Sequence, residues 1–419
     1  MQISELRQRL SRELQDIPLF DTHEHFIEES DRLKSKSDFF SYLHYVEADL
    51  VSSGMRRESS DLSVEEKKKL FFEYWPNVQH TGYGTALKIM AHDLFRVEEI
   101  TPETFDELNQ NAANFPQKGY YQTMLRERAN IARSLRIVWS YAPTMCDLDF
   151  LYPVPVFDHF ATVCSRKDIE GIEKESGQAI HCLRDVEDAL TRVFDQREDD
   201  GMVGVKIFLA YRRSLDFAQV ATAEAKVLFD RAMMNYDDTR VGFEESKPLQ
   251  DYMIHQIIQN AVERDLPVVI HTGFLNGNWQ LIDRTRPTQL TNLFMTYKTG
   301  RFVMLHGGWP YSQEFVALAK AFPNVYADMA WTWIVGPGMA ERLLGDLLDS
   351  VPVNKIFAFG GDYNFAEGAY AHARMARRGI RHVLAERIEH GRMTEEQALD
   401  VARMIMNENA GNVFGLNEG

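Results

Sequence analysis

The amino-acid sequence predicts a TIM (β/α)₈ barrel that occupies residues 1–419 as a single domain, with a helical insertion after the first strand. The second half of the chain alternates short apolar runs with amphipathic stretches at helical spacing, which is typical of repeated β-α units around a parallel sheet. The length of 419 residues suits a barrel with insertions. Because 45% of the residues are hydrophobic, the chain can bury a large core.

Five apolar runs in the second half predict barrel strands. Helix-like segments such as SQEFVALAKAF and GMAERLLGDLLDS separate them, and each separation suits one β-α unit. A right-handed series of such units closes most often as a barrel. The five runs are GMVGVKIFLAY, LPVVIHTGF, RFVMLHGGW, NVYADMAW and KIFAFGGDY, and they contain Lys206, His271, His306, Asp328 and Asp362.

The first half of the chain is less regular. IPLFDTHEHF predicts the first strand, and SLRIVWSYA and YPVPVFDHF predict the second and third. Residues 27–118 are polar with helical spacing, and proline residues such as Pro76 are expected to break the helices there. We therefore expect residues 27–118 to form a helical insertion over the barrel mouth, where loops after the strands shape the substrate pocket. Two long helices after the last strand complete the chain.

The charge balance limits the partners of this protein. Asp and Glu outnumber Lys and Arg by 62 to 46, and the net charge of −16 repels phosphate backbones and anionic lipid, which argues against nucleic-acid binding. No apolar run reaches the roughly 18 residues of a membrane helix, and the N-terminus reads as a charged amphipathic helix rather than a signal sequence. We expect a cytoplasmic homo-oligomer that acts on a small molecule.

Five residues at the ends of predicted strands form a candidate metal site. His23 and His25 point to the same face of the first strand because side chains alternate along a strand. Taken alone, the His-x-His pair is weak evidence for a metal site, since 13 histidines in 419 residues produce roughly 0.4 pairs of this spacing by chance. His271, His306 and Asp362 strengthen it, because each also follows a predicted strand, at the catalytic rim of a barrel. A lone histidine at such a position is more often structural, whereas all five together indicate a metal site.

The order of the motifs DTHEH, IHTGF, LHGGWPY and GGDYNF resembles the amidohydrolase superfamily. It is most similar to the amidohydrolase-related branch, amidohydrolase 2, which includes FluG-like and nodulin-like domains; uronate isomerases and the aminocarboxymuconate-semialdehyde decarboxylase group are more distant. The resemblance extends from Phe20 to about Leu416 and is strongest from Lys206 onward. It implies that His23 and His25 bind the metal and that His271 is a ligand or lies close to it. It also implies that Asp362 binds or approaches the metal and moves a proton, while His306 is a second ligand or polarises the substrate.

The ligand types implied by the resemblance suit hydrolysis. Neutral imidazoles and a carboxylate favour Zn²⁺, and we expect one ion per chain, with Mn²⁺ as the alternative. Such an ion lowers the pKa of bound water from 15.7 toward about 7, so that a metal-bound hydroxide can attack a carbonyl carbon. Asp362 would act as general base and then general acid, and a protonated His306 could share the charge on the carbonyl oxygen. The expected substrate is a small amide, cyclic amide or lactone, with a carboxylated substrate as one form.

Four further residues are candidates for substrate binding. In binuclear members of the family a lysine of the fourth strand is carboxylated and bridges two metals; Lys206 could do this, or could pair as an ammonium with Asp362 or with a substrate carboxylate. The single-metal site is the favoured reading. Arg212 could hold a substrate carboxylate or belong to a solvated loop. Trp309 and Trp331 could line the pocket or pack in the core.

Two other functions remain open at this point. The same ligands serve sugar-acid isomerisation and non-oxidative decarboxylation in related families, and these reactions differ from hydrolysis in the pocket loops rather than in the ligands. A barrel that binds metal or ligand without turnover, as a regulatory or scaffold domain, is the third possibility. It is disfavoured because no ligand position of the family pattern is missing.

Overall fold

The computed structural model describes residues 2–35, 38–56, 62–142, 148–236 and 244–417. Contacts within the chain divide it into two compact units. Unit 1 consists of Met1–Ser134, Phe274–Leu281 and Asp328–Gly411, and unit 2 consists of Leu135–Gly273, Ile282–Ala327 and Asn412–Gly419. Strands β2 and β7 each begin in one unit and end in the other, so the chain passes between the units within regular strands.

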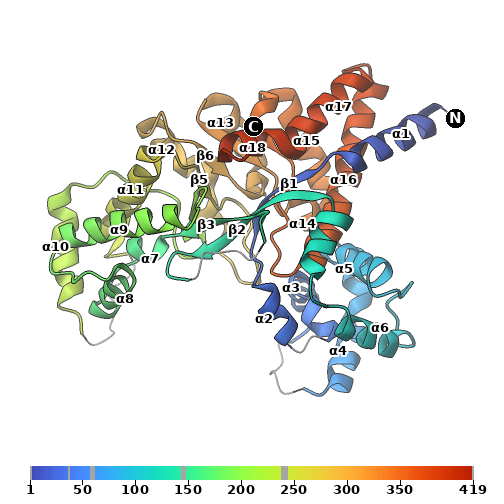
Figure 1. The fold of residues 1–419 in the computed structure, drawn as a ribbon, viewed down its shortest axis with the longest axis horizontal. Helices are drawn as coiled ribbons and strands as arrows, with labels where there is room; N and C mark the ends of the chain where they lie inside the picture. The colour runs from blue at the N-terminus through green and yellow to red at the C-terminus, as the bar shows by residue number, and fades with distance from the viewer. Residues whose placement is uncertain (1, 36–37, 57–61, 143–147, 237–243, 418–419) are drawn as a thin grey trace. The chain divides into compact units, whose positions relative to one another are not determined.

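Eight parallel strands form one sheet in which the order of the strands follows the sequence (Figure 1). The first and last strands are joined in unit 1, where both the backbone N–H and the hydroxyl of Thr22 donate to the carbonyl oxygen of Phe359. This is the TIM (β/α)₈ barrel that the sequence predicts, and all eight predicted strands are present. The strands are β1 (Leu19–Glu24), β2 (Ile131–Trp139), β3 (Leu151–Val156), β4 (Val205–Ile207), β5 (Val268–Ile270), β6 (Phe302–Met304), β7 (Val325–Asp328) and β8 (Ile356–Phe357).

The strands of unit 2 are short and almost wholly buried. Val205 of β4 pairs with Val268 of β5, which pairs with Phe302 of β6, and these residues are buried on both faces of the sheet. Continuous apolar runs of this kind are typical of parallel strands with helices outside and side chains inside. The paired strands begin and end at the same positions along the sheet, so the residues that follow them lie at one edge. His271 follows β5 at this edge, and His306 lies just after β6.

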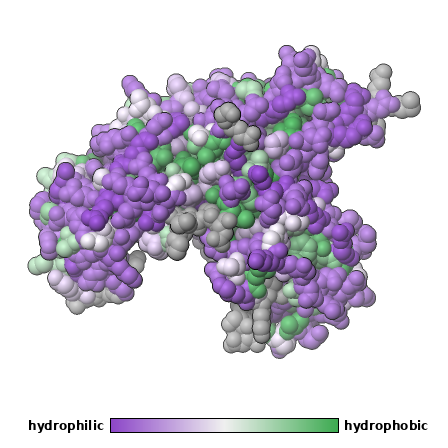
Figure 2. All heavy atoms as spheres, in the orientation of Figure 1, coloured by the Kyte–Doolittle hydropathy of each residue, from purple (hydrophilic) through white to green (hydrophobic). Residues whose placement is uncertain are grey.

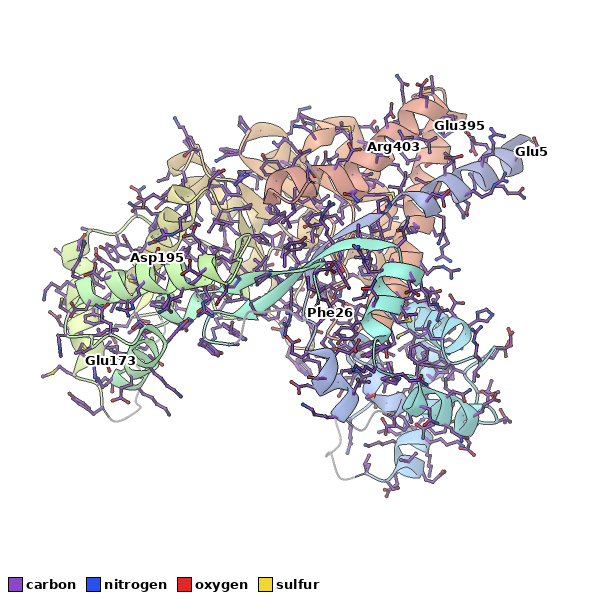
Figure 3. The ribbon with its side chains drawn as sticks, viewed as in Figure 1. Glu5, Phe26, Glu173, Asp195, Glu395 and Arg403 are labelled. Atoms are coloured by element: carbon purple, nitrogen blue, oxygen red, sulfur yellow. The ribbon has the colours of Figure 1, made fainter. Side chains whose placement is uncertain are left out.

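Unit 1 surrounds its strands with helices from both ends of the chain. The longest helix, α16, packs against α1 and α5, and the Arg9 guanidinium of α1 pairs with Glu395 of α17 at 3.0 Å. Figure 3 shows Glu5 and Glu395 on these two neighbouring helices. The helices are α1 (Gln2–Asp16), α2 (Glu29–Lys34), α3 (Tyr45–Ser52), α4 (Val64–Val78), α5 (Gly82–Asp93), α6 (Phe105–Asn114), α14 (Thr332–Val335), α15 (Pro337–Ser350), α16 (Ala366–Glu389) and α17 (Glu395–Arg403). The helix α18 (Asn409–Phe414) runs from unit 1 into unit 2.

Residues 27–118 hold the helices α2 to α6, which have an aromatic core of their own. The ring of Phe39 contacts those of Phe71 and Phe105 at centroid distances of 5.4 and 5.8 Å. One expectation here was wrong, since Pro76 lies inside α4 rather than ending it. A proline in the last turn removes one hydrogen bond, and α4 ends only two residues later at Val78. The position of the whole segment over the barrel mouth stays a prediction.

Unit 2 places its helices outside β3 to β6. They are α7 (Asp158–Ala161), α8 (Arg166–Ser176), α9 (Leu183–Asp199), α10 (Thr222–Met233), α11 (Lys247–Glu263), α12 (Thr291–Thr296) and α13 (Ser312–Ala321). Hydrophilic residues cover most of the face drawn in Figure 2, including the surface over α8 and α9. Within the described ranges, the structure has no helix that combines the length and the apolar character needed to cross a bilayer.

Candidate metal centre

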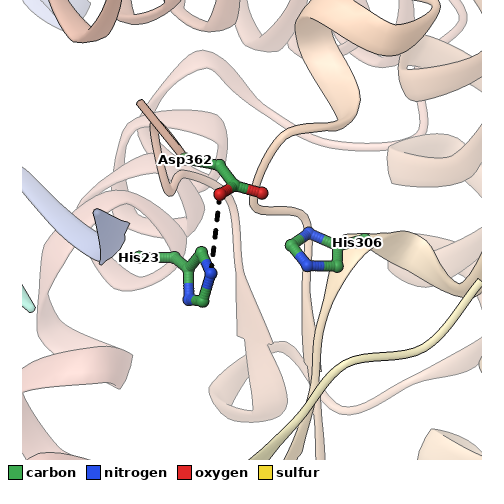
Figure 4. A group of neighbouring side chains, drawn as sticks. All are labelled: His23, His306 and Asp362. Carbon is green, nitrogen blue, oxygen red and sulfur yellow. Dashed lines mark ion pairs between the residues drawn. The ribbon is translucent and has the colours of Figure 1, made fainter. Parts of the chain in front are cut away.

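Two imidazoles and one carboxylate converge at the end of β1 in unit 1. His23 Nε2 lies 3.6 Å from Asp362 Oδ1, and His25 Nε2 lies 3.2 Å from the same oxygen. Figure 4 marks the first of these pairs. His23 and Asp362 are buried, whereas the His25 side chain is one-third exposed. The strand alternation predicted for His23 and His25 therefore does bring both rings to one carboxylate.

The backbone around Asp362 is held in an unusual conformation. Its N–H donates to the carbonyl oxygen of His23 at 2.7 Å, and the Tyr45 hydroxyl donates to the carbonyl oxygen of Asp362. Asp362 has φ 60°, in the left-handed region that side chains other than glycine rarely adopt. Strain of this kind persists only where neighbours enforce it, and it is common at functional sites.

Two buried carboxyl groups that the sequence analysis did not select support the same strand. Asp21 accepts the N–H of Gly361 at 3.0 Å and that of His23 at 3.3 Å, while Glu24 accepts the N–H of Tyr363 at 2.7 Å. Burial raises the pKa of Asp21 to about 6, and burial together with the charge of Asp21 raises the pKa of Glu24 well above its usual value. Their positions beside His23 in the motif DTHEH were the signal available in the sequence.

The donor set at this site fits a divalent cation. Two imidazole nitrogens and a carboxylate oxygen are the ligands of many catalytic zinc sites, which keep a further position open for water or substrate. Both nitrogens face one oxygen at distances a shared ion can occupy after small side-chain shifts. The hydrogen bonds to Asp21 and Glu24 hold the backbone that carries these donors, as outer partners do in metal sites.

Unit 2 brings together a second pair of predicted site residues. His306 Nε2 lies 3.1 Å from His271 Nδ1, with the two ring centroids 4.4 Å apart, and both side chains are buried. The Tyr211 ring meets His271 edge to face at 4.9 Å. His306 has φ 64°, so it shares with Asp362 a left-handed backbone after a barrel strand. Tyr211 was not selected from the sequence.

Lys206 is fully buried in β4, and its charge acts on a carboxyl group that the sequence analysis missed. Asp158 begins α7 just after β3 and accepts the N–H of Phe208 at 2.9 Å. Burial raises the pKa of Asp158 to about 7, although the charges of Lys206 and Arg212 oppose this rise. The motif FDHF at the end of the third predicted strand was the signal for Asp158.

The remaining substrate-binding candidates have different surroundings. Arg212 is exposed after β4, whereas its neighbour Arg213 is buried in an ion pair with Asp251 at 2.5 Å. Trp309 is half-buried after β6. Trp331 is almost wholly buried in unit 1, where its ring lies 5.1 Å from that of Tyr45. A role in substrate binding remains a prediction for each of them.

Comparison with known proteins finds a family match over more than half of the chain. Residues 176–416 match the amidohydrolase family. Protein fluG of Emericella nidulans is 27% identical over 234 residues, which cover 54% of this chain and 27% of that protein. The chain therefore spans about a quarter of the length of this curated relative.

Solved structures with the same fold cover nearly the whole chain. A uronate isomerase from Thermotoga maritima has a TM-score of 0.82 at 16% identity and covers 98% of this chain and 97% of its own. A glucuronate isomerase from Caulobacter crescentus has a TM-score of 0.76 at 14% identity. The match covers 100% of this chain and 95% of the isomerase chain. A Lactobacillus casei protein, provisionally described as a metal-dependent hydrolase, has a TM-score of 0.70 at 19% identity and covers 97% of both chains. These likenesses concern the fold.

The family match covers more than half of the 419 residues, includes β4 to β8, and contains His271, His306 and Asp362. Members of this family use a divalent metal ion, which agrees with the donor set at the end of β1. This chain belongs to the amidohydrolase family.

Proposed function

We propose that this protein is a metal-dependent hydrolase that cleaves a small amide, cyclic amide or lactone. The observation that supports it best is the approach of His23 Nε2 and His25 Nε2 to one oxygen of Asp362. In this proposal His23, His25, Asp362 and His271 hold the ion. When bound, Zn²⁺ supplies Lewis acidity that polarises a carbonyl group and makes water more acidic.

Asp362 is the proposed proton carrier. Its backbone is held at both ends, by His23 and by Tyr45, so its carboxylate keeps one place relative to the imidazoles. In the first step the carboxylate takes a proton from water while the water oxygen bonds to the carbonyl carbon. In the second step the C–N or C–O bond breaks, and the same proton passes to the leaving atom. The proposed role of His306 is to donate a hydrogen bond to the carbonyl oxygen as its charge increases.

We also propose that the protein uses one metal ion. Lys206 is buried, and its charge opposes the rise in the pKa of Asp158 that burial causes. Carboxylation would replace this ammonium by an anion next to a buried carboxyl group, which like-charge repulsion disfavours. In this view Lys206 remains an ammonium, and it and Arg212 are the candidates to bind a substrate carboxylate, with Trp309 and Trp331 as candidate pocket walls.

Isomerisation of a sugar acid is the second candidate function. The two isomerases named above share the fold over at least 95% of both chains, although their low identity supports the fold alone. Isomerisation needs the same ligands, with a proton moved between two carbon atoms in place of water attack.

A substrate screen separates the two functions. The protein loaded with Zn²⁺ or Mn²⁺ is tested against N-acyl amino acids, cyclic amides, lactones and uronates, with Asp362→Asn as the matched control. Release of an amine or hydroxy acid that depends on Asp362 is expected. Conversion of a uronate to a keto acid without hydrolysis of any other compound would favour the isomerase, and equal activity of Asp362→Asn would contradict both.

A further inference from the structure

Asp158 is a buried carboxyl group of unit 2 that the proposed reaction does not use. It is 6% exposed and lies two residues after the end of β3. Its Oδ2 accepts the N–H of Phe208 at 2.9 Å, whereas Oδ1 is buried and has no hydrogen-bond partner among the residues that the structure describes. Because a buried carboxylate oxygen without a donor is costly, Oδ1 marks a place for a donor from a ligand or from water.

The sheet register places Asp158 on the inner face of the strands. Val156 of β3 pairs with Lys206 of β4, so these two side chains lie on one face of the sheet. Phe157 points to the other face, where its ring stacks on Phe194 of the outer helix α9 at 4.2 Å. The charge of Lys206 acts on Asp158, as expected if Asp158 follows Val156 on the inner face.

Asp158 lies at the same edge of the sheet as His271. Lys206 pairs with Val269 of β5, two residues before His271, and the rings of Phe208 and His271 meet edge to face at 6.0 Å. Only β4 separates β3 from β5, so with a strand spacing of about 4.8 Å the backbone of Asp158 lies roughly 10 Å from that of His271. A ligand that reaches both residues must therefore extend beyond a single amide group.

The charged groups that act on Asp158 are both cations. Lys206 is buried and Arg212 is exposed, and the charge of each opposes the rise in the pKa of Asp158 that burial causes. One carboxylate beside two cations leaves a positive charge in excess, which suits a ligand carboxylate. The Oδ1 atom of Asp158 suits a donor instead. The three side chains together therefore match a group that carries a carboxylate and a hydrogen-bond donor.

We propose that Asp158 accepts a hydrogen bond from the substrate and thereby selects a molecule with an α-amino acid or α-hydroxy acid end. The ammonium or hydroxyl group on the α-carbon donates to Oδ1 of Asp158, and the adjacent carboxylate binds Arg212 and Lys206. The reacting carbonyl group lies at the other end of the molecule, towards His271. The inference rests on the proposed function for the place of this carbonyl group.

Three small ligands test the donor. Alanine, lactate and propionate share three carbon atoms and a carboxylate, and they differ only in the substituent on the α-carbon. Ligand-observed NMR measures their binding to the full chain loaded with Zn²⁺ at pH 8, above the pKa of about 7 of Asp158. Alanine or lactate should bind at least about tenfold more tightly than propionate, the usual effect of a charge-assisted hydrogen bond. The tighter of the two identifies the donor, and equal binding of all three, or no binding, would overturn the inference.

Asp158→Asn shows whether the preference originates at this residue. The amide carries no charge and presents an N–H group in place of one oxygen, so the preferred ligand should bind at least about tenfold more weakly. Propionate should bind as tightly as before or more tightly, because the two cations lose their opposing carboxylate. A folding defect would instead weaken all three ligands, and thermal unfolding checks the fold independently.

Asp188→Asn is the matched control, since it removes the same charge from an exposed position of α9 and should leave binding unchanged. A preference for alanine or lactate that persists in Asp158→Asn, as chelation of the metal would produce, would overturn the inference. The proposed function fails separately. The expected preference in a protein that hydrolyses none of the screened compounds would contradict the hydrolase and leave the role of Asp158 intact.

Discussion

At the level of single residues, Asp362 combines three properties that a proton-carrying ligand needs. It is buried, it lies next to two imidazoles, and its backbone is held in a left-handed conformation by His23 and Tyr45. A carboxylate held in this way loses little conformational entropy when a cation or substrate binds. The hydrogen bond to His23 links the backbone of Asp362 to β1, and the bond from Tyr45 links it to α3.

Replacing His23 tests the metal ligands directly. In His23→Ala one imidazole is lost from a buried site, and we expect activity to fall at least about 100-fold together with the bound metal content. Metal content is measured by elemental analysis and activity with the substrate that the screen identifies. The fold should survive, because the strand still pairs through its backbone. A variant that retains full metal content would contradict the assignment of His23.

A second residue-scale prediction concerns pH. His372 is fully buried, and its Nδ1–H donates to the carbonyl oxygen of Gly361 at 2.9 Å. Burial lowers the pKa of His372 from 6.5 to about 4, so the folded state binds the proton more weakly than the unfolded state does. Its contribution to the free energy of unfolding is present above pH 6.5 and is lost as the pH falls toward 4, by up to about 3 kcal/mol.

Urea unfolding between pH 4 and 8 measures this effect as the difference between the unmodified protein and His372→Asn. Asparagine can donate the same hydrogen bond and carries no titrating group in this range. The stability difference should stay constant above pH 7 and change steadily in favour of the variant below pH 6.5. A difference that is independent of pH would show that His372 does not titrate in this way.

At the level of elements, the helices of unit 1 pack so closely that some positions accept only glycine. A Cβ at Gly379 in α16 would lie 2.2 Å from Cζ3 of Trp333, whose ring is buried and whose Nε1–H donates to the carbonyl oxygen of Ala358 at 2.8 Å. The ring therefore cannot move aside without breaking that bond. This contact connects α16 to α14 and to the segment after β8.

Gly379→Ala is therefore expected to destabilise the protein by about 1–3 kcal/mol, the usual range for overpacking, although alanine favours helices. Gly345→Ala in α15 is the matched control, since a Cβ there meets no atom within 4 Å. The control should stabilise by about 0.5–1 kcal/mol through its helix propensity. Chemical denaturation measures the free energy of unfolding of both variants. A stabilised Gly379→Ala would show that the Trp333 ring can move aside.

At the level of the whole molecule, metal binding and stability should be linked. An ion that binds the folded chain and not the unfolded one raises the midpoint of thermal unfolding. We expect gently purified protein to contain about one divalent ion per chain and to unfold at a lower temperature after treatment with a chelator. Two ions per chain, together with a dependence on carbon dioxide, would contradict the single-metal proposal for Lys206. Assembly into a homo-oligomer remains a prediction that light scattering can test.

The predicted metal ligands fall into both compact units of the chain. Unit 1 contains the predicted ligands His23, His25 and Asp362, and unit 2 contains His271 and His306. Each set lies at the ends of strands of one parallel sheet, as in other barrels with loops at the carboxyl end of the strands. This arrangement separates the residues that form the fold from those available for chemistry.

The sequence by itself determined the barrel, its eight strands and the amidohydrolase family. Apolar runs with polar residues at their ends are local features, and their period follows from the geometry of strands and helices, so they can be seen without a structure. The recurrence of His23, His25, His271, His306 and Asp362 at such ends was visible for the same reason.

Only the tertiary structure decided which other side chains surround these residues. Asp21, Glu24 and Asp158 are carboxyl groups whose burial depends on the segments that fold against them, and Tyr45 reaches Asp362 from a helix whose position no local pattern specifies. Even Pro76, a helix breaker by propensity, is tolerated because the helix ends two residues later. Contacts of this range depend on packing between elements, which local propensity and periodicity do not encode.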